Sequence, residues 1–194
     1  MMKKLLIFAF IAQFSLLISQ VTSGCELQTL KSVNILKVDI KDLSCIAKNA
    51  DRPSTVFYTF TSWCAPCRQK MPMVLDLEKR FNAAVFVLIM ESEQDKMMPG
   101  GIDFIRKHAP EAKILILKDE AYTGGTRKRN SSFIADISSK KKMFNPGYGV
   151  FIVADSAGKV LKVTDNFTDY RKLANGSYES EERMLEREVF PLLN

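Results

Sequence analysis

The sequence predicts an α/β domain in which helices flank a central mixed β-sheet. Two apolar runs rich in β-branched and aromatic residues, 54–60 and 84–90, indicate strands buried in a parallel sheet. Segments with apolar residues at helical spacing separate the predicted strands, as expected where helices connect parallel strands. Residues 149–163 then predict a strand–turn–strand hairpin, and this antiparallel pair makes the sheet mixed.

The composition indicates an ordinary globular protein. The chain has 194 residues, of which 46% are hydrophobic and 26% are charged, which excludes a disordered chain. Residues 24–194 suit one domain with a proper core. The net charge is +6, but no long run mixes basic and aromatic residues, so nucleic acid is not an expected partner. The basic residues between 127 and 142 are interpreted as a solvated helical face.

Residues 1–23 are predicted to be a signal peptide. Two lysines precede a mostly apolar stretch, 5–18, that is shorter than the roughly 20 residues of a membrane span, and cleavage would fall before Gly24. An alternative is a bacterial lipoprotein signal ending before Cys25, which would then carry a lipid anchor. Both alternatives predict a periplasmic or otherwise extracytoplasmic protein, either free or anchored to the membrane as a lipoprotein.

The first half of the domain contains the clearest strand and the longest helix. Residues 31–50 predict a weak strand or hairpin at one edge of the sheet, and 54–60 predict a strong strand. A helix is expected after residue 67, with a kink at Pro72. Its inward positions recur at helical spacing, namely Met71, Val74, Leu75 and Phe81.

The second half alternates in the same way. Pro-Gly-Gly at 99–101 is expected to break the chain before a short helix at 102–108. The remaining predicted elements are a strand at 113–118, a helix around 133–137 that ends in a lysine run, a turn at 145–147, the hairpin at 149–163 and an acidic helix in the tail after Ser177.

Four cysteines can form disulfides if the domain leaves the cytoplasm. Cys64 and Cys67 lie in a Cys-x-x-Cys sequence and are the expected partners of one bond. If Cys25 is not lipidated, a Cys25–Cys45 disulfide would be a structural staple.

The Cys-x-x-Cys sequence follows a strand and begins a helix, which has a chemical consequence. Free N–H groups and the partial positive charge of a helix N-terminus stabilise a thiolate at Cys64. The thiolate is the attacking species in disulfide exchange. Cys67, one turn further into the helix, would be shielded and would resolve the mixed disulfide, and Pro66 would restrict the intervening loop.

The residues of the chain fit zinc binding, copper transfer and peroxide reduction at these cysteines less well than they fit disulfide exchange. A structural zinc site needs two more ligands, and the chain has one histidine and no second Cys-x-x-Cys. Copper transfer is disfavoured by the scarcity of histidine and the absence of a methionine-rich cluster near the cysteines. Peroxide reduction is disfavoured because Pro66-Cys67 suits dithiol exchange. Neither a metal nor a cofactor is expected.

Residues 61–68, Thr-Ser-Trp-Cys-Ala-Pro-Cys-Arg, followed by Met71-Pro72, resemble the thioredoxin superfamily. The similarity is greatest to the TlpA/ResA-like extracytoplasmic thiol–disulfide oxidoreductases of bacteria, and 150–160 is similar to that family's closing hairpin. The resemblance implies a thioredoxin-like fold over about 35–190. It also implies that Cys64 is the nucleophile, Cys67 the resolving cysteine and Trp63 the aromatic flank of the site.

The sequence departs from the family pattern at two places near the site. Lys70 stands where many members have a carboxylate; its cation would either favour thiolates or point into solvent. The cis-proline position that faces the active site in the family falls on Gly149, or on Pro146 if the loop is longer. The strand at 54–60 also lacks the buried aspartate of cytoplasmic thioredoxins.

These observations predict an extracytoplasmic thiol–disulfide oxidoreductase that exchanges disulfides with protein substrates through the sequence Trp-Cys-Ala-Pro-Cys at 63–67. Its partners would be proteins with thiols or disulfides and an upstream redox partner in the membrane or outside the cytoplasm. The alternative is a thioredoxin-fold binding or scaffold protein in which the Cys64–Cys67 disulfide is permanent and structural.

Overall fold

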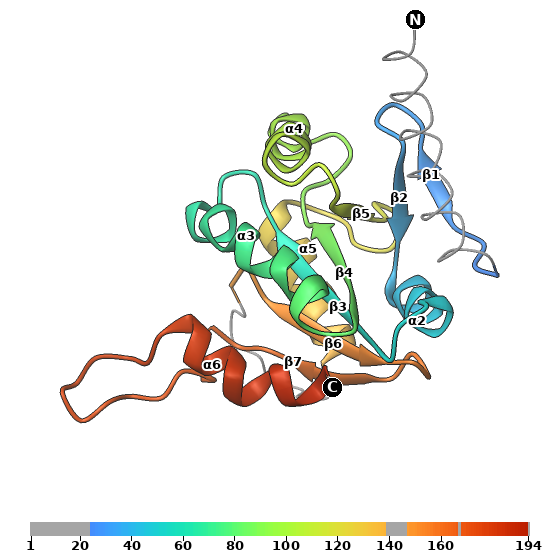
Figure 1. Ribbon diagram of the computed structural model, residues 1–194. Coiled ribbons are helices and arrows are strands. Elements are labelled where there is room, and N and C mark those ends of the chain that lie inside the picture. Colours follow the sequence, from blue (N-terminus) through green and yellow to red (C-terminus); the bar gives the residue numbers. More distant parts are fainter. Residues whose placement is uncertain (1–23, 139–146, 167, 194) are drawn as a thin grey trace, which may run out of the picture.

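The computed structural model describes residues 24–138, 147–166 and 168–193 (Figure 1). The predicted signal peptide, the lysine run at 140–142 and Pro146 lie outside these residues. Seven strands form one sheet in the order β1-β2-β5-β4-β3-β6-β7. The mixed sheet and its flanking helices confirm the predicted α/β, thioredoxin-like fold.

The centre of the sheet is parallel and its margins are antiparallel. β2, β5, β4 and β3 pair in parallel, whereas β1 pairs with β2, β6 with β3, and β7 with β6 in antiparallel fashion. β3 and β4 pair along seven residues and are buried at every position, as their continuous apolar sequences predict. The strands are β1 (Gln28–Leu30), β2 (Ile35–Val38), β3 (Ser54–Phe60), β4 (Ala83–Ile89), β5 (Lys113–Leu117), β6 (Phe151–Asp155) and β7 (Val160–Val163).

Helices cover both faces of the sheet. One core contains side chains of α3, α4 and α6 with Val56, Tyr58 and Phe60 of β3, and the other contains side chains of α2 and α5 with Phe57. This division follows the alternation of side chains along a strand. The helices are α2 (Ile40–Asn49), α3 (Ala65–Arg80), α4 (Met98–His108), α5 (Thr126–Ile137), α6 (Glu181–Glu188) and the short 3-10 helix η1 (Phe190–Leu192).

Several elements differ from the sequence-based expectation. Of the segment 31–50, which was predicted to hold a weak strand or hairpin, only β2 is a strand; it pairs with β1, which precedes that segment. The helix α2 in the same segment was not predicted. The helix α4 begins at Met98, so Pro99, Gly100 and Gly101 form its first turn instead of breaking the chain. Proline is tolerated there because the first N–H groups of a helix have no partner within the helix.

The basic segment is not a uniformly solvated face, because Arg129 on α5 is buried. Its guanidinium donates to the carbonyl oxygens of Met90, Leu117 and Tyr122 and pairs with Asp119 at 2.8 Å. The guanidinium thus donates to carbonyl oxygens at the carboxyl ends of β4 and β5, and Asp119 compensates its buried positive charge.

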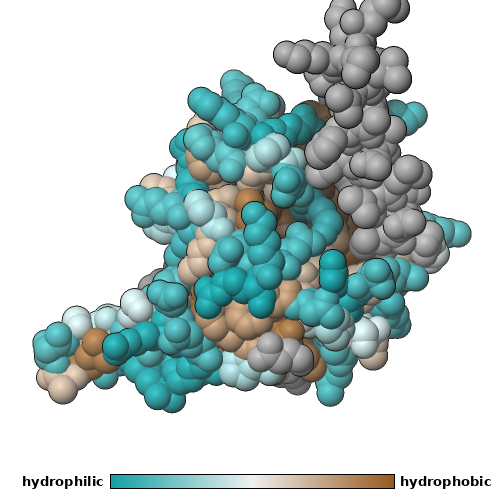
Figure 2. Space-filling model, viewed as in Figure 1, coloured by the Kyte–Doolittle hydropathy of each residue, from teal (hydrophilic) through white to brown (hydrophobic). Residues whose placement is uncertain are grey.

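A hairpin at 170–179, which we call the arm, projects from the body beside α6 (Figures 1 and 2). Leu173 N–H donates to Ser177 O at 2.8 Å and Glu179 N–H to Arg171 O at 2.9 Å, so the two legs are hydrogen-bonded. Gly176 has φ +84° at the turn, a conformation that favours glycine. Figure 2 shows the arm as mostly hydrophilic, with hydrophobic residues near its end.

No helix in the described part of the chain is long and apolar enough to cross a membrane. Cys25 forms a disulfide with Cys45 of α2, with 5.9 Å between the Cα atoms. A sulfur bound in a disulfide cannot also form the thioether of a lipid anchor. The disulfide therefore gives no support to lipidation at Cys25.

Replacing both Cys25 and Cys45 by serine should lower the free energy of unfolding by about 3 kcal/mol, because the bond closes a loop with a sequence separation of 20. Guanidinium denaturation of the oxidised proteins measures this difference. The difference in unfolding free energy should disappear once the wild-type bond is reduced. Equal stability of the oxidised wild type and variant would show that the bond does not stabilise the fold.

Candidate active site

The loop from β3 to α3 places Cys64 at the N-terminus of α3. Cys64 is the N-cap residue, and its Sγ accepts a hydrogen bond from Cys67 N–H at 3.2 Å. Pro66 lies in the first turn, where a missing N–H costs nothing. The sulfur of Cys64 therefore lies at the positive end of the helix dipole, as the sequence predicts for a stabilised thiolate.

The two cysteines form a disulfide but differ in accessibility. Cys64 is 9% exposed and Cys67 is fully buried, with 5.2 Å between their Cα atoms. Only Cys64 presents an edge to solvent. A partner arriving from outside would thus meet Cys64 first, which is the order required of an attacking and a resolving cysteine.

Tyr58 and Gly149 enclose Cys67 from the sheet. The Tyr58 hydroxyl donates to Cys67 O at 3.3 Å, and burial raises the pKa of this phenol. Gly149, just before β6, has φ +75°, and a Cβ at this position would lie 3.3 Å from Cys67 Sγ and 2.9 Å from Tyr58 Oη. Gly149 is therefore the residue that faces the Cys67 sulfur, and no peptide bond of the described residues is cis.

A buried carboxyl group supports the loop before Cys64, and sequence reasoning missed it. Glu91 lies two residues after the end of β4 and is fully buried; its Oε1 accepts a hydrogen bond from Ser62 N–H at 2.5 Å. Its Oε2 has no hydrogen-bond partner among the described residues. Burial raises the pKa of the Glu91 carboxyl. The available signal was a single carboxylate placed directly after a wholly apolar run of residues.

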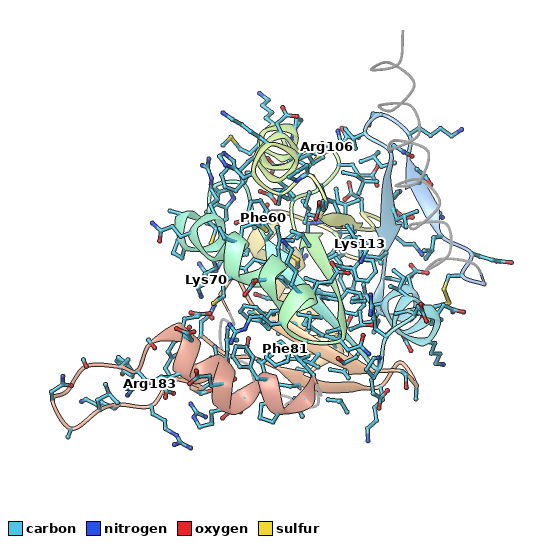
Figure 3. The ribbon with its side chains drawn as sticks, in the orientation of Figure 1. Phe60, Lys70, Phe81, Arg106, Lys113 and Arg183 are labelled. Atoms are coloured by element: carbon cyan, nitrogen blue, oxygen red, sulfur yellow. A yellow bond between two sulfur atoms is a disulfide. The ribbon has the colours of Figure 1, made fainter. Side chains whose placement is uncertain are left out.

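Lys70 does not point into solvent, which was one of the two alternatives left open by the sequence. Its ammonium pairs with Glu181 of α6 at 2.6 Å, and its side chain is 19% exposed. Figure 3 shows Lys70 on the side of α3 that is turned towards α6. Glu181 also accepts a hydrogen bond from the Tyr170 hydroxyl. The positive charge of Lys70 is therefore compensated by a carboxylate.

A cleft of about 580 Å³ opens beside Cys64. Its lining includes Pro66 and Lys70 from α3, Tyr148 from the loop before β6, and Tyr178 from the arm. The exposed ring of Trp63 contacts Tyr148 edge-on, with 4.8 Å between the ring centroids. Among the described residues, no group of three or more histidine, cysteine, aspartate or glutamate side chains is arranged to hold a metal ion.

No known protein-family model and no curated protein sequence matches this chain. Solved structures do match. The thioredoxin domain of a thiol–disulfide oxidoreductase from Bacteroides vulgatus is 13% identical, with a TM-score of 0.38 over 57% of this chain and 68% of that one. A second Bacteroides vulgatus structure is 18% identical, with a TM-score of 0.40 over 60% of this chain and 65% of that one.

A thioredoxin-like protein from Porphyromonas gingivalis is 14% identical, with a TM-score of 0.47 over 75% of this chain and 78% of that one. The chain thus spans about two thirds of the length of the two Bacteroides structures and more of the Porphyromonas structure. At these identities the likenesses concern the fold alone.

Replacing Glu91 by glutamine should stabilise the protein increasingly as pH rises above about 4, the range in which a glutamate of the unfolded chain loses its proton. The native state holds the Glu91 proton more tightly, so the wild type alone loses stability there. Glutamine remains able to accept the Ser62 hydrogen bond and does not titrate. Urea denaturation of both proteins from pH 4 to 8 measures the difference; a difference independent of pH would contradict the raised pKa.

Replacing Gly149 by alanine should lower the free energy of unfolding by about 1–3 kcal/mol, through its positive φ and the close approach of Tyr58 and Cys67. Gly176→Ala is the matched control, because Gly176 also has positive φ but nothing lies within 4 Å of its added Cβ. The Gly149 variant should lose more stability than the control in thermal denaturation. Equal losses would mean that only backbone conformation matters at Gly149.

Proposed function

We propose that the protein is an extracytoplasmic thiol–disulfide oxidoreductase that exchanges disulfides with protein substrates through Cys64 and Cys67. The observation that carries the proposal is the asymmetric disulfide at the N-terminus of α3. Cys64 borders the cleft at the positive end of the helix, and Cys67 is buried behind it. A low-pKa attacking thiol and a shielded resolving thiol are the two parts that disulfide exchange needs.

In the reduced protein the reaction has two steps. The Cys64 thiolate attacks a substrate disulfide, which forms a mixed disulfide and releases one substrate thiolate. The Cys67 thiolate then attacks the Cys64 sulfur, which closes the protein disulfide and releases the second substrate thiolate. Two electrons pass from the protein to the substrate, and the substrate thiolates take up protons from solvent. Substrate oxidation is the reverse sequence.

The compartment is supported by two features of the chain. Residues 1–23 have the sequence of a signal peptide. A second disulfide, Cys25–Cys45, is of the structural kind that persists in oxidising compartments. Because each turnover leaves the Cys64–Cys67 pair in the wrong redox state, an upstream thiol–disulfide partner must reset it.

One observation favours the alternative, a binding or scaffold protein with a permanent disulfide. Both sulfurs are largely enclosed, since Cys64 is only 9% exposed and Cys67 has no exposed surface. A permanent disulfide would need no attacking cysteine at a cleft, whereas Cys64 borders one. Oxidoreductase activity is therefore the better supported function.

Replacing Cys64 by serine should abolish insulin reduction in the presence of dithiothreitol, because the attacking thiolate is lost. Replacing Cys67 by serine should instead trap a covalent mixed disulfide with the substrate, visible as a mass increase that dithiothreitol removes. The Cys25→Ser/Cys45→Ser variant is the control and should retain activity. Retained activity of Cys64→Ser, with no adduct on Cys67→Ser, would reverse the two roles.

A further inference from the structure

We propose that the arm forms one wall of the cleft and that this wall selects substrates. It would favour polypeptide segments that carry aromatic or aliphatic side chains beside the reacting cysteine. This inference rests on the proposed function, because it names the substrate class of the same site. Four features of the arm and the cleft support it: the attachment of the arm, the placement of its rings, the pairing of its charges and the size of the cleft.

The base of the arm is attached to the active-site helix. Glu181, at the start of α6, pairs with Lys70 of α3 at 2.6 Å and accepts a hydrogen bond from Tyr170. Arg187 of α6 pairs with Glu179 at the end of the arm and donates to the carbonyl oxygen of Asp169, just before the arm, at 2.6 Å. The arm is therefore held at a defined position relative to the helix that begins with the catalytic sequence. This attachment gives Lys70 a positioning role.

The arm presents aromatic rings to the cleft beside Cys64. Tyr170 and Tyr178 of the arm line the same cleft as Pro66 of α3 and Tyr148. Tyr178 is 63% exposed although it belongs to a hydrogen-bonded hairpin, and its ring has no aromatic partner among the described residues. Exposed aromatic rings on a rigid backbone bind apolar side chains at low entropic cost, which is why tyrosine is enriched at protein interfaces.

The charged side chains of the cleft are already paired. Lys70 is compensated by Glu181, and Glu179 is compensated by Arg187 and accepts a hydrogen bond from Arg171 N–H. No unpaired cation among the described lining residues is left to bind the carboxylates of an acidic substrate such as glutathione. The cleft should therefore bind substrates in which the residues beside the disulfide are uncharged and apolar.

The volume of the cleft suits a short segment of polypeptide. About 580 Å³ lies in the middle of the roughly 300–1,000 Å³ range of ligand clefts. The cleft is continuous with Cys64, so a disulfide reaching the sulfur places its neighbouring residues between the arm and the loop at Tyr148. The occupant we infer is an extended segment with an apolar residue on at least one side of its cysteine.

Three pentapeptides test the inference: Gly-Phe-Cys-Phe-Gly, Gly-Ser-Cys-Ser-Gly and Gly-Glu-Cys-Glu-Gly, each joined through its cysteine to the same thiopyridine group. Release of thiopyridone by the reduced protein gives the second-order rate constant. The wild type should react with the phenylalanine peptide about five- to tenfold faster than with the serine peptide, as one aromatic contact predicts. The glutamate peptide should be the slowest.

Tyr178→Ala should lower the rate with the phenylalanine peptide more than the rate with the serine peptide, so that the preference falls to within about twofold. Tyr178→Phe should keep the preference. Leu161→Ala is the matched control, because Leu161 on β7 is also a large exposed apolar side chain but does not line the cleft. Tyr178 is exposed, so its replacement should not unfold the domain.

Three outcomes would overturn the inference, and they differ from failure of the proposed function. Equal rates with all three peptides, or equal effects of Tyr178→Ala and Leu161→Ala, would remove the selecting role of the arm while leaving the exchange chemistry intact. Dimerisation that Tyr178→Ala abolishes would assign the cleft to a second copy of the chain. A wild type that reduces neither cystine nor any peptide would remove the proposed function together with this inference.

Discussion

The seven-residue parallel pairing of β3 with β4 is the constraint on which the site depends. Both strands are buried at every position, so neither can slip in register without exposing apolar side chains or burying polar ones. Because parallel strands end at the same edge of the sheet, the loop that carries Ser62 and Cys64 emerges beside Glu91. The hydrogen bond between Ser62 and Glu91 then fixes that loop, and α3 begins with the sulfur of Cys64 at its positive end.

The parts of the fold that the sequence predicted well are those whose signals are local. A continuous apolar run defines β4, a β-branched and aromatic run defines β3, and the spacing of Cys64 and Cys67 places the disulfide on a helix start. The helix α2 was missed because few of its residues are buried, although a capping box at its start was a usable signal. Glu91, Tyr148 and the arm could not be assigned from the sequence, because their roles depend on contacts between segments far apart in the chain.

The two residues at which the sequence departs from the pattern of the family that it resembles have physical consequences in this structure. Gly149 leaves the space that Tyr58 and Cys67 occupy, which no side chain could do without displacing one of them. Lys70 forms an ion pair with Glu181 at the start of α6, and this pair links α3 to the segment that follows the arm. The surroundings of Cys64 are therefore aromatic and electrically balanced, while the buried carboxyl group of the site, Glu91, lies behind the loop and not in the cleft.

We propose that the Cys64–Cys67 disulfide is exchanged and is not a permanent part of the fold. Its reduction potential, measured by equilibration with a graded series of glutathione and dithiothreitol buffers, tests this claim most directly. An exchanged disulfide should show a reversible two-electron transition between about −120 and −270 mV, the range of dithiol oxidoreductases. A potential below about −300 mV, with no exchange in glutathione, would contradict the account and identify a structural disulfide.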